Sequence, residues 1–166
     1  RNLSHLASGD FRWFWVRWHS QLFPNGWPYG EELDKLVLVP QDRRLDERVY
    51  WGLDSILAKL RQSQGLLWSV LSNETVGSMR AKEIEIENNR GPVQYPQLFH
   101  GGVRAHPDDP LKALINLEAT FRARYFEHTT HMFNIQRIKR AQGLKTRVDL
   151  PFEGYHAMPD WDVSEP

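Results

Sequence analysis

Apolar residues recur every three or four positions in four stretches of the chain, which is the spacing of one helix face. The first predicted helix covers residues 10–23 and the second covers 40–61. A third is predicted over 66–87, although Gly77 interrupts it and its last residues, EIEIE at 83–87, alternate as a strand does. We interpret this stretch as a helix because it offers charged pairs three or four residues apart.

The fourth predicted helix is the longest, and both of its ends carry signals. Asp109 is placed to cap its start, and Pro110 suits the first helical position. Lys139 and Arg140 suit the negative end of the helix dipole, and Gly143 suits the stop. About 33 residues would extend roughly 50 Å, so we expect part of this helix to lie along a neighbour. Its apolar face is formed by Leu114, Leu117, Phe121, Tyr125, His128, Met132 and Ile135.

Two stretches rich in proline and glycine, 88–110 and 148–166, show no helical period. A connection as long as the first is usually functional or forms an arm laid on a partner. The pattern therefore predicts an all-α fold. We expect a single helical domain over 1–166, with about four helices and two extended arms.

The composition then narrows the classes of protein. Lys+Arg and Asp+Glu number 21 each, so the net charge is +0, unlike that of a globally basic nucleic-acid-binding protein. The absence of cysteine excludes disulfides, thiol catalysis and cysteine-ligated zinc. No run of about 18 apolar residues occurs, so no membrane-spanning helix is expected. The start at Arg1 rather than Met would fit the removal of a targeting segment.

The sequence carries no motif of a nucleophilic, phosphate-loop or dinucleotide-binding enzyme, and we expect neither catalysis nor a cofactor. The histidines leave one alternative open, a small metal-dependent enzyme that uses His100, His106 and His131. His128 and His131 lie three apart on the long helix, but no glutamate follows the pattern of a metalloprotease helix and a third ligand would be arbitrary, so no metal site is predicted. His128, on the apolar face of the long helix, is expected to be a hydrogen-bonded core histidine.

The predicted helix at 10–23 is the most informative segment, because tryptophan, phenylalanine and arginine are concentrated in it. Tryptophan and arginine are enriched where proteins bind one another, and tryptophan also favours membrane–water interfaces. A buried core helix is the alternative interpretation. We predict a docking helix that seats the chain on a larger partner. The residues predicted to contact the partner are Phe11, Trp15, Arg17, Trp18 and Leu22.

The end of the long helix and the residues after it are locally basic, with arginines and lysines between 122 and 147. These side chains fit a solvated helix face or contacts to phosphate groups. A mitochondrial ribosomal or other RNA-associated protein is therefore a second hypothesis. The balanced total charge argues against it, so nucleic acid is not the expected partner.

A series of short motifs runs through the first part of the chain. They are SGDFRWFWVRW at 8–18, NGWPYGEEL at 25–33, Pro40, DERVY at 46–50, and Leu66-Leu67-Trp68. In this order they resemble the small helical accessory subunit of the mitochondrial cytochrome bc1 complex (ubiquinol–cytochrome c reductase), sometimes called the ubiquinone-binding protein. The resemblance covers about a third of the chain.

The resemblance implies a non-catalytic accessory subunit that supports assembly and electron transport. It would be peripheral to the mitochondrial inner membrane, on the matrix side, with cytochrome b and the core subunits as partners and with lipid nearby. Arg17, Trp18, Arg48 and Tyr50 would be packing contacts to these partners. Another mitochondrial complex, either complex I or ATP synthase, stays an alternative.

Overall fold

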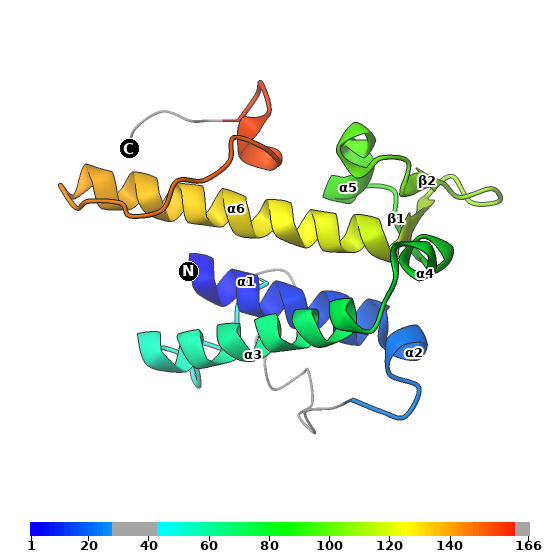
Figure 1. Cartoon of the computed structure of the whole chain (residues 1–166), viewed down its shortest axis with the longest axis horizontal. Coiled ribbons are helices and arrows are strands. Elements are labelled where there is room, and N and C mark those ends of the chain that lie inside the picture. Colours follow the sequence, from blue (N-terminus) through cyan, green and yellow to red (C-terminus); the bar gives the residue numbers. More distant parts are fainter. Residues whose placement is uncertain (28–42, 162–166) are drawn as a thin grey trace.

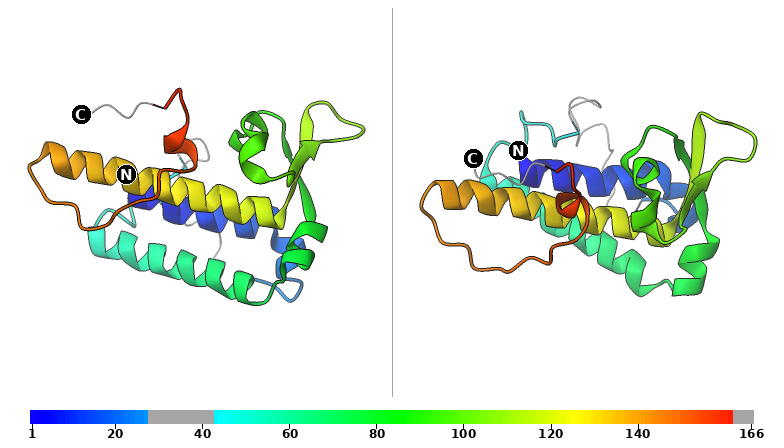
Figure 2. Two further views of the ribbon diagram at one scale, coloured as in Figure 1. Left: turned by 45° about the horizontal axis from the view of Figure 1, so that its top comes forward. Right: turned by 90° about the horizontal axis from the view of Figure 1, so that it is seen from above.

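Three helical segments lie side by side and form the body of the structure (Figures 1 and 2). The computed structural model describes residues 1–27 and 43–161. The first segment runs from α1 (Asn2–Phe11) through a π-helical turn, η1 (Arg12–Arg17), to α2 (His19–Leu22). The other two segments are α3 and α6, and α1 packs against both.

The helix predicted at 10–23 is therefore confirmed in type, but its predicted start is wrong. Ser8 and Asp10 are of residue types that often cap a helix start, but both lie inside α1 and are fully buried. The Ser8 hydroxyl donates to the carbonyl oxygen of Arg43 over 2.7 Å, and the Asp10 carboxylate belongs to a buried ion pair. Because tertiary partners satisfy these polar groups, the helix continues through them.

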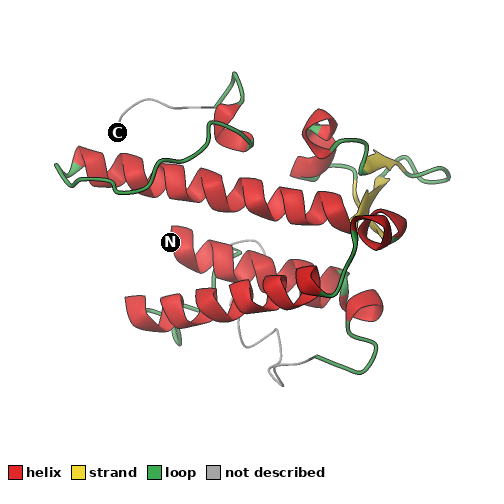
Figure 3. Ribbon diagram, in the orientation of Figure 1, coloured by secondary structure: helices red, strands yellow, loops and turns green. Residues whose placement is uncertain are grey.

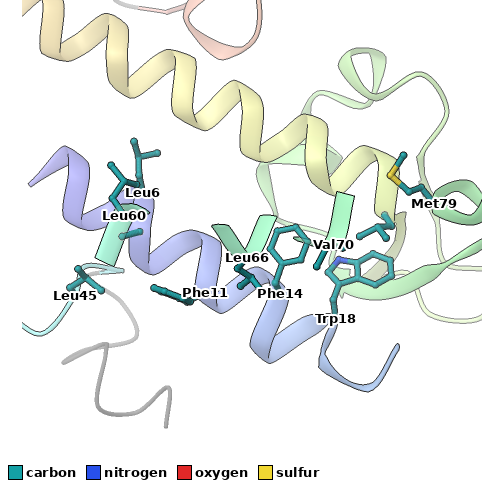
Figure 4. Close-up of a cluster of buried hydrophobic side chains, with 11 residues drawn as sticks. Leu6, Phe11, Phe14, Trp18, Leu45, Leu60, Leu66, Val70 and Met79 are labelled. Atoms are coloured by element: carbon teal, nitrogen blue, oxygen red, sulfur yellow. The ribbon is translucent and has the colours of Figure 1, made fainter. Parts of the chain in front are cut away.

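The apolar face of this first segment forms the centre of the main hydrophobic core (Figure 4). Phe11, Phe14 and Trp18 are fully buried, and Trp18 Nε1 donates to Thr120 Oγ1 over 3.1 Å. Burial of each such side chain contributes about 1.5–3 kcal/mol. The face predicted to dock on a partner thus holds the chain itself together. The other members of this core are Leu6, Ala7, Leu45, Leu60, Leu66, Val70, Met79 and Leu117.

The second segment, α3 (Leu53–Ser72), lies beside α1 and corrects both ends of the helix predicted at 40–61. The described residues before it, 43–52, form turns and irregular structure. Within them Leu45 is buried in the core and Val49 is exposed. The apolar spacing that suggested one helix face there comes from residues that do not share a face.

The helix predicted at 66–87 is divided among three elements. Its first part belongs to α3, and the rest forms α4 (Val76–Ala81) and β1 (Glu83–Glu87). Thr75 caps α4, since its side chain accepts from the Ser78 N–H over 3.1 Å. The alternation of EIEIE, which the helical interpretation overrode, was the correct signal for a strand.

A small antiparallel sheet with strand order β1-β3-β2 lies at one end of the molecule (Figure 3). The prediction of an all-α fold is therefore wrong, and the fold is mostly helical with a three-stranded sheet. β1 pairs with β3 (Lys112–Asn116), which also pairs with β2 (Val103–Ala105). Ile84 lies opposite Ile115, and Ile86 is buried on the same face.

The connection at 88–110, predicted to be an extended arm, is folded against α6. It contains α5 (Gly91–Gln94), the 3-10 turn η3 (Pro96–Phe99) and β2. Phe99 is buried, and its ring lies 5.9 Å from the ring of Phe126 on α6. The arm prediction is wrong because apolar side chains inside the stretch form a second core with α6.

The described part of the C-terminal tail, 148–161, folds back along α6 (Figures 1 and 2). Its 3-10 turn, η4 (Tyr155–Ala157), packs against Phe126. The preceding Gly154 has φ 79, and a Cβ there would lie 2.6 Å from the Phe126 ring. The close approach and the left-handed backbone both require glycine.

The third segment, α6 (Leu117–Ala141), is the long C-terminal helix that the sequence predicts, with a later start. Its 25 residues correspond to about 37 Å. Asn116 rather than Asp109 is the cap, because its side-chain oxygen accepts from the Ala119 N–H over 2.8 Å. The residues between these two positions are held in β3 instead.

The predicted end of α6 is confirmed. Gly143 has φ 72, and its N–H donates to the Arg140 carbonyl over 2.9 Å. The N–H of Leu144 donates to the Lys139 carbonyl over 2.9 Å, which completes a glycine-dependent helix stop. Among the described residues, every helix is too short or too polar to cross a bilayer.

Parts of three sequence predictions lie outside the described residues. They are 28–33 of the second motif, 40–42 at the start of the second predicted helix, and 162–166 of the tail.

Candidate functional site

A cavity of about 510 Å³ lies beside the N-terminal helical segment. Its wall is built by η1, by the middle of α6, by the chain around α5 and by the end of the described tail. This volume is within the usual range for a site that binds a small molecule. Elements that are far apart in the sequence therefore meet around one partly open cavity.

Arginines dominate the wall of this cavity. They are Arg12, Arg17, Arg43, Arg90 and Arg124. Two of them belong to the π-helical turn η1, which directs Arg12, Trp13 and Arg17 to the cavity while Phe14 stays in the core. Turns of this kind are frequent at functional sites.

Within the described part of the chain, positive charge around the cavity exceeds negative charge. Glu127 is the acidic residue in the wall. Behind the wall, Asp10 pairs with Arg124 over 2.7 Å and Glu87 pairs with Arg90 over 3.1 Å. Among residues 1–27 and 43–161, these three carboxylates face Arg17, Arg43, Arg90 and Arg124, and this excess of positive charge favours an anion.

The pKa values of two arginines reflect this crowding. Burial, followed by the charge of Arg90, lowers the pKa of Arg17 to about 10. Burial also lowers the pKa of Arg12, with further contributions from the charges of Arg43 and Arg90. Both guanidinium groups stay protonated at pH 7, so their desolvation and mutual repulsion cost free energy that a bound anion would recover.

Two buried polar atoms of residues that line the cavity have no hydrogen-bond partner within the described residues. They are Arg90 Nε, a donor, and Thr130 Oγ1, which can donate or accept. Buried polar atoms in native proteins are nearly always paired. Both atoms are closed to solvent, so a ligand in the cavity would reach them only after the side chains shift.

Aromatic side chains form another part of the wall: Trp13, Tyr95, Tyr155 and Trp161. The guanidinium carbon of Arg17 lies 4.4 Å from the centre of the Trp13 ring, a cation–π geometry. Burial, the largest cause, raises the pKa of Tyr155. Its hydroxyl therefore stays protonated at physiological pH.

His5, Glu127 and His131 form a small cluster in the same wall. Burial, the largest cause, lowers the pKa of His5 to about 4, so its ring is neutral at pH 7. Burial tends to raise the pKa of Glu127, but the hydrogen bond from His131 and the charge of Arg124 outweigh it and lower this pKa. The cluster thus combines a carboxylate with two imidazoles.

A second polar cluster is centred on Asp10, which is fully buried and does not line the cavity, although its partner Arg124 does. The Asp10 carboxylate accepts from Arg124 Nε over 2.7 Å and from Ser63 Oγ over 3.0 Å, and His128 Nε2 lies 3.0 Å from it. Burial tends to raise the pKa of Asp10, but the charge of Arg124 and the hydrogen bond of His128 outweigh it and lower this pKa.

This Asp10 cluster links α1, α3 and α6. The acid lies between the serine and the histidine, whereas a catalytic triad places the histidine in the middle. The cluster is therefore structural. The prediction that His128 is hydrogen-bonded is confirmed, but the prediction that it belongs to the core is not, because its side chain is 20% exposed.

The residues predicted to dock on a partner are not brought to one surface. Phe11 and Trp18 are fully buried in the chain's own core, so a partner cannot contact them in the folded chain, and this part of the prediction is corrected. Trp15 and Leu22 are half-buried, with Leu22 packed against the same core. Arg17 alone of this group lines the cavity.

Arg48 and Tyr50, the other two predicted contacts, lie in the turns before α3. Arg48 is bound to Asp46 in the same turn through a 2.7 Å ion pair. Tyr50 packs partly against the main core, with Lys59 Nζ 5.6 Å from its ring centre. Neither residue lines the cavity.

The fold does not bring together the three histidines of the metal-dependent alternative, His100, His106 and His131. His131 is grouped with His5 and Glu127, whereas His106 lies 3.4 Å from Glu85 beside the sheet. The only group of metal-ligand side chains within 1–27 and 43–161 omits His100 and His106. The sequence shows that Glu127 and His131 lie four residues apart on a predicted helix. It does not show that His5 lies beside them.

Comparisons of this chain with protein-family models, with curated proteins and with solved structures gave no match.

Proposed function

We propose that this protein binds a small organic anion, carrying a phosphate or carboxylate group, in the arginine-lined cavity. The observation that carries the proposal is the arginine-rich wall of the cavity. Guanidinium groups present paired donors that match phosphate and carboxylate oxygens. The same groups have little to gain from a neutral ligand.

The aromatic part of the wall supports an organic ligand over a bare ion. Trp13 and Tyr95 line the cavity together with the arginines, so a flat or apolar portion of the ligand has surfaces to pack on. A volume of about 510 Å³ also exceeds what inorganic phosphate needs. We therefore favour a phosphorylated molecule that contains a ring, as a nucleoside monophosphate does.

Isothermal titration calorimetry in EDTA-containing buffer tests this proposal with three probes: AMP, inorganic phosphate and uncharged adenosine. We expect AMP to bind best, phosphate more weakly and adenosine not measurably. Arg17→Gln and Arg90→Gln should each weaken AMP binding about tenfold or more, since a hydrogen bond to a charged group contributes about 1.5–3 kcal/mol.

The matched control is Arg61→Gln, which removes an exposed arginine on α3 that is not part of the cavity wall. It should leave AMP affinity unchanged. An equal loss of AMP affinity in all three variants would show a general charge effect. If the folded wild type bound neither AMP nor inorganic phosphate, the proposal would be refuted.

A second candidate is the accessory subunit of a mitochondrial respiratory complex that the motifs suggested, with the cytochrome bc1 complex preferred. The observation that favours it is a set of exposed tryptophans: Trp51 is 83% exposed and Trp68 is 70% exposed. Trp68 lines an apolar groove with Leu71, Phe121 and Tyr125. Exposed aromatic residues of this kind anchor protein–protein interfaces.

Native electrophoresis of detergent-solubilised mitochondria tests the second candidate. An accessory subunit should migrate with its complex, and Trp51→Ala combined with Trp68→Ala should release it. Migration as a free monomer in the wild type would rule this candidate out. Because neither tryptophan lines the cavity, this double variant should leave AMP binding intact.

A further inference from the structure

We infer that His5, Glu127 and His131 form a binding site for one divalent transition-metal ion, with open coordination positions facing the arginine-lined cavity. The metal site stands on these three side chains. The identity of the ligand that completes the coordination, an oxygen of the cavity's anion, rests on the proposed function.

The distances suit a metal ion. One ligand atom from each of the three side chains lies within 4.8 Å of the other two. His131 Nε2 and Glu127 Oε2 are 3.5 Å apart. Two ligands of a tetrahedral zinc ion, each about 2.0–2.1 Å from the metal, would be about 3.4 Å apart. The spacing of Glu127 and His131 therefore needs little adjustment, and binding one ion would bring the His5 ring nearer to this pair.

The fold holds these ligands in place from two helices. Glu127 and His131 are four residues apart on α6 and so project from the same face. His5 comes from α1, with its ring centre 5.0 Å from that of His131. Because α1 and α6 are packed together through the core, the three side chains meet without depending on a loop.

A further contact orients one ligand. His131 Nδ1 lies 3.0 Å from Asn2 Oδ1, and the amide oxygen can only accept. This contact places the proton of the neutral ring on Nδ1 and leaves the lone pair on Nε2, which faces Glu127. Metal-bound histidines characteristically use their second nitrogen in this way.

The ligand types of these three side chains indicate which metal ions the site would prefer. Two imidazoles and one carboxylate suit zinc, cobalt or iron(II) rather than magnesium or calcium, which prefer oxygen ligands. Three protein ligands with open positions are the arrangement of sites that bind an exogenous ligand, whereas structural zinc sites use four protein ligands. The open positions here face a cavity lined by arginines.

The neighbouring charges predict a coupling between metal and anion. Arg43 and Arg124 line the same cavity and repel a bare divalent cation. An anion that binds both the metal and the arginines removes this repulsion. Phosphate should therefore tighten metal binding, and the metal should tighten phosphate binding by the same factor.

The test titrates cobalt(II) into protein that was freed of metal with EDTA, dialysed, and produced without a histidine tag. Visible absorption reports the coordination, and zinc competition reports the affinity. We expect one equivalent to bind. His5→Ala, Glu127→Gln and His131→Ala should each weaken binding at least tenfold, and saturating phosphate should strengthen it in the wild type at least fivefold.

The control variant is His106→Ala, which removes a histidine paired with Glu85 on the sheet. It should bind cobalt as the wild type does. Circular dichroism and His5→Gln, which keeps polarity and approximate size, separate loss of a ligand from loss of folding.

Failure of folded wild type to bind one equivalent would overturn the metal site, as would equal binding by wild type and the three ligand variants. Metal binding without any effect of phosphate would refute the shared anion while leaving the three-residue site. AMP binding measured in EDTA tests the arginine cavity by itself, so the two proposals fail separately.

Discussion

The two faces of the N-terminal helical segment, residues 2–22, differ sharply although they share one backbone. One face buries Phe11, Phe14 and Trp18 in a core where the indole nitrogen has a partner. The other presents Arg12 and Arg17 to a cavity where cations repel one another. The first face stabilises the fold, and the second is costly to maintain, which is the usual mark of a binding site.

Removal of a large side chain from the core face should give the largest effect. Phe14→Ala is expected to lower the free energy of unfolding by about 3–5 kcal/mol, because it leaves a cavity between the first segment and α6. Urea denaturation followed by circular dichroism measures this. Val16→Ala, in the same turn but 60% exposed, should change it by less than about 0.5 kcal/mol. Similar losses in both variants would contradict the distinction between the faces.

The buried ion pair beneath the cavity should be almost as sensitive. Asp10→Asn leaves Arg124 buried without a counter-charge and should cost about 3–5 kcal/mol at pH 7. The folded state lowers the pKa of Asp10 below its ordinary 3.8, so this stabilisation is complete above that value and is lost as the pH falls through the folded pKa.

The pH dependence gives a direct check of this ion pair. The difference in unfolding free energy between wild type and Asp10→Asn should be constant from pH 7 to about pH 5 and should shrink at lower pH. Urea titrations at several pH values measure it. A difference that grows as the pH falls below 4 would show that Asp10 is not held as a carboxylate.

An intermediate effect is expected at Gly9, where the segment lies close to Arg124 of α6. A Cβ at Gly9 would lie 2.9 Å from a terminal nitrogen of Arg124. Gly9→Ala should therefore displace this guanidinium and lower the unfolding free energy by about 1–3 kcal/mol. Gly65→Ala, at a helical position with no atom within 4 Å, should instead be neutral or stabilising by up to about 1 kcal/mol. Thermal denaturation of both variants compares them.

The smallest effect on stability, with a clear effect on binding, is expected on the cavity face. Arg17→Gln removes a desolvated cation, so the unfolding free energy should change by less than about 1 kcal/mol. The same substitution should reduce AMP affinity about tenfold. A stability loss as large as that of Phe14→Ala, without a change in affinity, would make Arg17 a structural residue.

Local signals in the sequence were informative where neighbours along the chain decide the structure. The glycine stop at Gly143 was predicted and is confirmed, since its hydrogen bonds run within one helix turn. The long helix was also predicted, but its start was wrong, because pairing of 112–116 with β1 overrides the cap signal of Asp109. The alternation of a strand at 83–87 was visible in the sequence, but the strand with which it pairs, β3, was not.

The sequence by itself determined the helical spacing of Phe11, Phe14 and Trp18, the stop of α6 and the alternation in β1, because each depends on residues a few positions apart. Only the tertiary structure decided that the aromatic face meets α3 and α6 rather than a partner. It alone placed Arg90 and the cluster of His5, Glu127 and His131 around the same cavity as Arg17. Those contacts join segments separated by many residues, and which of them form depends on the burial and pairing of the whole chain at once.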